Sequence, residues 1–155
     1  MISPDITKKW LAVSGLLDLI GREMPYREKE ETTVMMRREL SLWLPFMDLL
    51  EGFGQDKDIQ QHLARNGVNP VPAMASVQEA KVYFEIVNRH LSKTETISTR
   101  NRELYIRYTN NLYASLKNAL DKVKPKTKGQ LIIDYAVNMI TAMLIALSTI
   151  RREQY

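Results

Sequence analysis

The feature that most constrains the fold is a strongly apolar segment at residues 131–150, LIIDYAVNMITAMLIALSTI. Its length is enough to cross a bilayer, which takes about 20 apolar residues, and basic residues flank it like interfacial anchors. Four polar residues interrupt it at spacings of four, three and seven: Asp134, Asn138, Thr141 and Ser148. These spacings place them on one narrow strip of a helix.

The free-energy balance for membrane insertion of this segment is close to zero. Its eight Leu, Ile and Val residues between 131 and 147 favour insertion by roughly 0.5 kcal/mol each, whereas one Asp in mid-membrane costs about 3 kcal/mol. A helix that is apolar on nearly every side is typical of the buried centre of a helical protein. We therefore predict a central core helix. A membrane-associated protein that spans the bilayer at 131–150 ranks third among the functions considered, after the two given below.

Composition narrows the class of protein. A chain of 155 residues is expected to form one domain, 1–155, large enough to bury a core without disulfides. The absence of cysteine excludes disulfides, thiolate zinc sites and cysteine nucleophiles. The first residues, MISPDITKK, lack the apolar run of a secretory signal, so we expect a cytoplasmic protein.

Apolar residues recur at intervals of three and four along most of the chain, a pattern that predicts amphipathic helices. We expect helices over about 4–22, from 28–32 to about 51 with a kink or short break at Pro45, and over 56–65, 77–91, 100–123 and 131–150. No alternating pattern typical of strands persists. The prediction is an all-α protein, a single-domain bundle of five or six helices around the apolar C-terminal helix.

The segment VNPVPA at 68–73 is predicted to be the clearest non-helical stretch, because proline disfavours helical backbone in the residue before it. A sub-division of the domain near 68–75 is an alternative to one continuous bundle. Ser76 and Glu79 have the spacing of a capping box, which predicts that the next helix begins there.

Charge is distributed unevenly. Residues 1–76 carry 9 Lys/Arg and 11 Asp/Glu, and residues 77–155 carry 13 and 7. The basic excess is concentrated in region 89–128, which predicts contact with nucleic acid or with an acidic partner. The candidate contact residues are Arg89, Arg100, Arg102, Arg107, Lys117, Lys122, Lys124, Lys126 and Lys128. Nearby tyrosines either stack on bases or belong to the core, and Tyr105 and Tyr108 fit the apolar stripe of a helix, which favours the core.

No motif for catalysis, metal binding or phosphate binding emerges. His62 and His90 lie in different predicted helices and lack metal-ligand spacing, and the glycines form no phosphate loop. We predict a non-enzymatic helical protein, without cofactor, that acts in protein–protein interaction or as an adaptor or assembly protein. Its partner is another protein or a second copy of itself in a homo-oligomer, and a small-molecule ligand is not expected. The alternative is a nucleic-acid-associated protein that uses the basic region 89–128.

Overall fold

The computed structural model describes residues 5–93, 96–123 and 132–150. Within these ranges the chain is all-α and contains no strand, which confirms the predicted helical bundle. Its elements are α1 (Asp5–Glu23), the 3-10 turn η1 (Met24–Lys29), α2 (Thr32–Gln55), α3 (Lys57–Arg65), α4 (Pro70–Lys93), α5 (Thr99–Asp121) and α6 (Ile132–Leu147).

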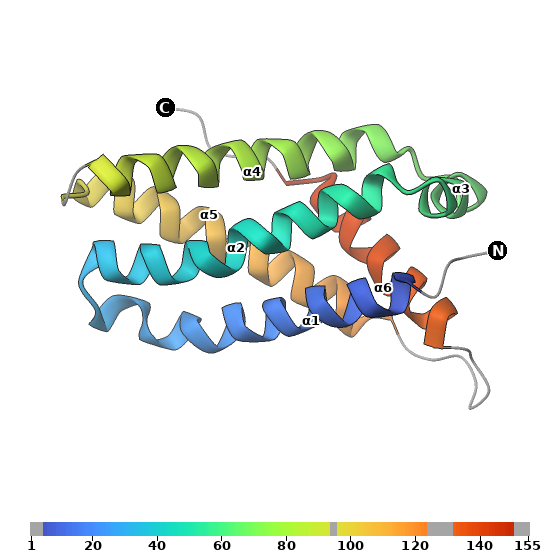
Figure 1. Ribbon diagram of the computed structural model, residues 1–155, viewed down its shortest axis with the longest axis horizontal. Coiled ribbons are helices and arrows are strands. Elements are labelled where there is room, and N and C mark those ends of the chain that lie inside the picture. The colour runs from blue at the N-terminus through green and yellow to red at the C-terminus, as the bar shows by residue number, and fades with distance from the viewer. Residues whose placement is uncertain (1–4, 94–95, 124–131, 151–155) are drawn as a thin grey trace.

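Four long helices set the shape of the bundle. Helices α1, α2, α4 and α5 run along its long axis, and successive ones point in opposite directions (Figure 1). Helix α2 packs along both α1 and α4, while α5 packs mainly against α6. Helix α6 lies at an angle to the long helices and contacts α1, α4 and α5, with smaller contacts to α2 and α3.

The helix bounds follow the apolar rhythm closely in the first half of the chain. In α1, the residues Ile6, Trp10, Val13, Leu17 and Ile20 are all buried, at alternating spacings of four and three that place them on one helix face. The predicted second helix is also present. Helix α2 continues through Pro45 without reversing, so its apolar face remains a single surface from Thr32 to Gln55.

The centre of the core is aromatic and joins three helices. Trp43 of α2 stacks on Phe84 of α4, with ring centroids 5.3 Å apart, and also meets Phe46 edge-on. Phe84 in turn contacts the rings of Tyr105 and Tyr108 on α5. Tyr105 and Tyr108 are both buried, as the apolar pattern favoured, so their rings hold helices together.

The prediction of a non-helical stretch at 68–73 is wrong from Pro70 onward, because α4 begins at that residue. The first N–H groups of a helix have no intrahelical partner, so prolines in the first turn lose no hydrogen bond there. The Asn69 side chain also accepts a hydrogen bond from the backbone N–H of Val71, at 3.0 Å. Prolines that were interpreted as helix breakers are therefore compatible with the first turn of α4.

The predicted capping box is also wrong. Ser76 lies inside α4 and is buried, and its Oγ donates a hydrogen bond to the carbonyl oxygen of Ile150, at 3.3 Å. With the helix starting at Pro70, Ser76 occupies its second turn and has no free N-terminal N–H to cap. The serine instead links α4 to the backbone that follows α6.

The polar strip predicted along the C-terminal helix has mixed environments. Thr141 is buried, whereas Asn138 and Ser148 are partly exposed, and the side chain of Asp134 lies outside the described residues. In the ranges that the structure describes, no helix has the length and apolar character needed for a membrane span.

Replacing Thr141 by Val should raise the free energy of unfolding by about 1 kcal/mol. The Thr141 Oγ1 is buried and has no hydrogen-bond partner among the described residues, so folding removes it from water without compensation. Urea unfolding of T141V and the native chain measures the difference. A loss of stability in T141V would show that the hydroxyl does form a bond.

Candidate functional site

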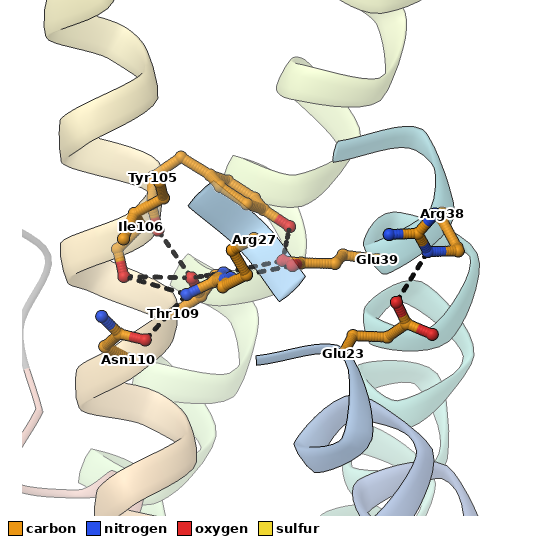
Figure 2. A network of polar contacts seen from close by, with 8 residues as sticks. All are labelled: Glu23, Arg27, Arg38, Glu39, Tyr105, Ile106, Thr109 and Asn110. Atoms are coloured by element: carbon orange, nitrogen blue, oxygen red, sulfur yellow. Dashed lines mark hydrogen bonds and ion pairs between the residues drawn. The ribbon is translucent and has the colours of Figure 1, made fainter. Parts of the chain in front are cut away.

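A buried ion pair joins the α1–α2 connection to the bundle. Arg27 of η1 and Glu39 of α2 have side chains that are only 3% and 1% exposed. The Arg27 Nε donates to Glu39 Oε2 at 2.8 Å and its Nη2 to Oε1 at 2.6 Å, the two-pronged geometry favoured by guanidinium and carboxylate. Figure 2 shows these two side chains pointing toward each other between the helices.

Helix α5 supplies the remaining partners of Arg27. Its Nη1 donates to Asn110 Oδ1 at 2.7 Å and to the carbonyl oxygen of Ile106 at 3.4 Å, and its Nη2 also donates to Thr109 Oγ1. Together with the two bonds to Glu39, these contacts match the five N–H donors of a guanidinium. The positive charge is therefore both neutralised and fully hydrogen-bonded, which compensates for its removal from water.

Tyr105 completes the network, which we call the Arg27–Glu39 network. Its hydroxyl donates to Glu39 Oε1 at 2.9 Å, and its ring lies 5.6 Å from the Arg27 guanidinium carbon. Burial, together with the negative charge of Glu39, raises the pKa of Tyr105 well above its ordinary value of 10.0. The ring hydroxyl consequently remains protonated and remains a donor. Because these groups bind one another inside the core, the network stabilises the packing of η1 and α2 against α5.

Sequence reasoning missed this network, although one signal of it was present. Glu39 follows Met35 by four residues and precedes Trp43 by four, so a carboxylate occupies a position in the row of apolar residues. A buried charge needs a partner of opposite sign. The partner could not be identified, because Arg27 belongs to a short connection without a helical rhythm.

The acidic cluster before α2 has definite roles. Glu28, Glu30 and Glu31 lie just before α2, which begins at Thr32. The Glu31 carboxylate caps α2 by accepting bonds from the backbone N–H groups of Thr33 and Val34, at 3.0 and 3.2 Å. Glu30 instead pairs with Arg38, which also binds Glu23 at 2.7 Å. The Arg38–Glu23 pair lies beside the buried network (Figure 2), and its side chains are 37% and 26% exposed.

Replacing Glu31 by Gln should lower the melting temperature at neutral pH, and the difference should disappear in acid. Hydrogen bonds from Thr33, the largest contribution, hold the pKa of Glu31 below its ordinary value of 4.5. A lowered pKa gives stability that is present above pH 4.5 and is lost as the pH falls through the lowered value. Melting curves of E31Q and native protein from neutral to acidic pH test this, with E28Q as a control for loss of the same charge. A difference independent of pH would contradict the cap.

The predicted basic residues do not form one surface. Arg100 and Arg107 are exposed and lie two turns apart on one face of α5, whereas Arg102 is half-buried and lies about 200° around the helix from Arg100. Lys117 pairs with Asp121 at 3.4 Å. Two other candidates, Arg89 on α4 and Lys122 at the end of α5, are exposed. Lys124, Lys126 and Lys128 lie outside the described residues.

A surface groove of about 300 Å³ lies between α4 and α5, and we call it the α4–α5 groove. It is lined by Met36, Tyr83, Ile86, Val87, His90, Ile97, Asn101 and Leu104. Ile86 is 52% exposed, and Val82, one turn earlier on α4, is 42% exposed. Most of the lining is therefore apolar and part of it is open to solvent, an arrangement typical of binding surfaces.

Two other hollows have a different character. One of about 390 Å³ lies beside Trp10 and Tyr113, with Asp18, Lys117 and Asp121 in its wall. The other, of about 420 Å³, is a shallow depression between α5 and α6, lined largely by small or polar residues. Neither combines an apolar lining with a large side chain as exposed as Ile86, so the α4–α5 groove is the better candidate for binding.

The described part of the chain thus offers two distinctive features, a buried polar network centred on Arg27 and Glu39 and a mostly apolar groove at the surface. The N–H donors of Arg27 are all used within the network, and the groove has apolar surface still exposed to water. No family model matches this chain, and comparison with curated proteins and with solved structures gives no match either.

Proposed function

We propose that this chain is a non-enzymatic helical protein that binds another protein through the α4–α5 groove. The observation that supports this most directly is the exposure of Ile86 in a groove with a mostly apolar lining. Burying apolar surface gains roughly 25 cal/mol per Å², so a partner that covers Ile86 and Val82 gains binding free energy at this position. Grooves between helices commonly accept an amphipathic helix whose apolar face enters them.

Binding to nucleic acid is the second candidate. The exposed positions of Arg100 and Arg107 on one face of α5 favour it, because such residues can contact neighbouring phosphates. The burial of Tyr105 and Tyr108 weighs against it, since these rings are not available to stack on bases. The groove therefore carries the main proposal.

A display library of amphipathic helical peptides, selected on the purified protein, tests the proposed function. We expect binders that are lost with the variant I86S and retained with V71S. Val71 is a matched control because it is also on α4, is 68% exposed, and lies at the opposite end of the helix from the groove. A selection that yields no binder, or only binders that tolerate I86S, would refute the proposal.

A further inference from the structure

We infer that a second copy of this chain packs against the outer face of α1, antiparallel to it and crossing at Gly15. This face is separate from the α4–α5 groove, because α2 lies between α1 and α4 (Figure 1). Self-association through α1 therefore does not depend on the proposed function of the groove. Three features of α1 support it, namely its exposed leucines, the open space above Gly15 and the order of charges along the helix.

The face of α1 that points away from the core is apolar. Val13 and Leu17 are buried, and Gly15 lies two residues from each. Because a helix turns by about 100° per residue, Gly15 faces almost directly away from these two side chains. Leu11 and Leu19, four residues to either side of Gly15, lie within about 40° of its direction and are 63% and 44% exposed. Two large apolar side chains are therefore open to solvent on the two sides of a glycine.

The single chain does not require a glycine at position 15. A Cβ atom built there would have no atom within 4 Å apart from the backbone of its own helix, and the φ angle of Gly15 is not positive. Glycine also weakens a helix interior relative to alanine. A second helix benefits from this residue, because the absence of a side chain allows two backbones to approach closely.

The apolar pattern is symmetric about Gly15, which favours a second copy over an unrelated helix. In an antiparallel pair with its two-fold axis at Gly15, both copies contribute the same surface to the contact. Leu11 and Leu19 each lie about 6 Å along the helix from Gly15. Leu11 of either copy is then level with Leu19 of the other, so all four exposed leucines are covered at once.

The charges of α1 are complementary in the same arrangement. Residues 10–17 carry no charge, Lys8 and Lys9 precede them, and Asp18, Arg22 and Glu23 follow them with a net charge of −1. An antiparallel copy places the two lysines beside the second group and Lys8 level with Glu23, whose side chain is 26% exposed although it also pairs within its own chain. A parallel copy would place the lysines of both chains together, which disfavours that orientation.

A contact made by one helix face is small, so we expect a weak dimer. Interfaces below about 1,200 Å² are typical of weak or transient complexes. Light scattering of the purified chain from ~10 μM to ~1 mM covers the range of dissociation constants expected for such a contact. The buffer should contain ~150 mM salt, because the net charge of +4 on each copy is then screened beyond about 8 Å.

The variant L11Q/L19Q tests the apolar contact. The exposed fractions of the two leucines add up to about one full side chain per copy, so their loss should raise the dissociation constant by about a hundredfold. The melting temperature at low concentration should stay close to that of the native chain. The matched control is V34Q/V71Q, which changes two valines that are 51% and 68% exposed on α2 and α4 and should leave association unchanged.

Cysteine cross-linking tests the orientation, since the native chain contains no cysteine. Under mild oxidation G15C should form a covalent dimer, because the crossing brings the two Cα atoms within the ~4.4–6.8 Å typical of a disulfide. L11C mixed with L19C should cross-link faster than either variant alone. V34C gives the background rate for an exposed position on another helix.

Each alternative outcome would overturn the inference. A chain that remains monomeric at ~1 mM, or association that L11Q/L19Q does not weaken, would show that this face does not pair. Cross-linking of L11C alone at the rate of the mixture would indicate a parallel pair. Self-association abolished by I86S would place the contact at the α4–α5 groove. A selected helical peptide that is lost with L11Q/L19Q, on a chain that does not self-associate, would replace the second copy by another protein.

Discussion

Replacing Glu39 by Ala is expected to lower the free energy of unfolding by about 3–5 kcal/mol, the cost of removing one partner from a buried ion pair. The change leaves the Arg27 guanidinium charged, with its side chain 3% exposed, and without the acceptor of two of its five bonds. The Tyr105 hydroxyl also loses its acceptor in a fully buried position. Urea unfolding followed by circular dichroism measures the loss.

A double variant separates the charge from the packing. In R27M/E39L both charged groups are replaced by apolar side chains, so no uncompensated charge remains, and such replacements can be close to neutral. We expect the double variant to be more stable than either R27M or E39L alone, which is a non-additive result. Arg38→Met serves as the surface control, because the Arg38 side chain is 37% exposed and its ion pairs are in contact with water. If E39A lost no more stability than R38M, the buried pair would not have the role described.

Replacing Trp43 by Ala should cost about 3–5 kcal/mol, the typical penalty for removing a large aromatic side chain from a core. Trp43 is fully buried and contacts Phe46 on its own helix and Phe84 on α4. Its removal opens a cavity at the junction of α2 and α4, the most extensive helix pair in the bundle. Thermal and urea unfolding, both followed by circular dichroism, measure the effect.

Phe at the same position is the informative comparison. The Trp43 Nε1 is buried and has no hydrogen-bond partner among the described residues. Trp43→Phe therefore removes an uncompensated polar group while it retains much of the ring, and we expect it to be clearly less destabilising than Trp43→Ala. Tyr26→Ala is the exposed control, since Tyr26 is 58% exposed and its loss should change stability by less than about 0.5 kcal/mol. Equal losses for the Ala and Phe variants would indicate that the indole N–H is bonded in solution.

The Glu39 and Trp43 substitutions are expected to destabilise the fold, so they are unsuitable for testing where a partner binds. Phe84, which Trp43 supports, contacts Tyr105 and Tyr108 and so connects α4 to α5, the two helices that border the groove. Binding lost in a Trp43 variant would therefore not identify the groove as the binding surface. Ile86, Arg100 and Arg107 are exposed, so variants at these positions can change the surface without disturbing the core.

The candidate site was only partly accessible from sequence. The basic excess after residue 86 was evident from composition, and its surface positions at Arg100 and Arg107 agree with the solvent-facing side of α5. The groove was not predicted, because its lining comes from α2, α4, α5 and the segment before α5. Helical periodicity assigns each residue to a face of its own helix, but it contains no information about which faces adjoin.

The sequence by itself determined the helices, because the apolar spacing of three and four residues is a local property that only a helix can bury on one side. Its two errors, at 68–73 and at Ser76, came from interpreting Pro and Ser without knowing which helical turn they occupy. Only the tertiary structure decided that Arg27 meets Glu39 and that helix α5 closes the network. Partners 12 to 83 residues apart are chosen by the packing of helices, since burial makes a charge costly until another segment brings its complement.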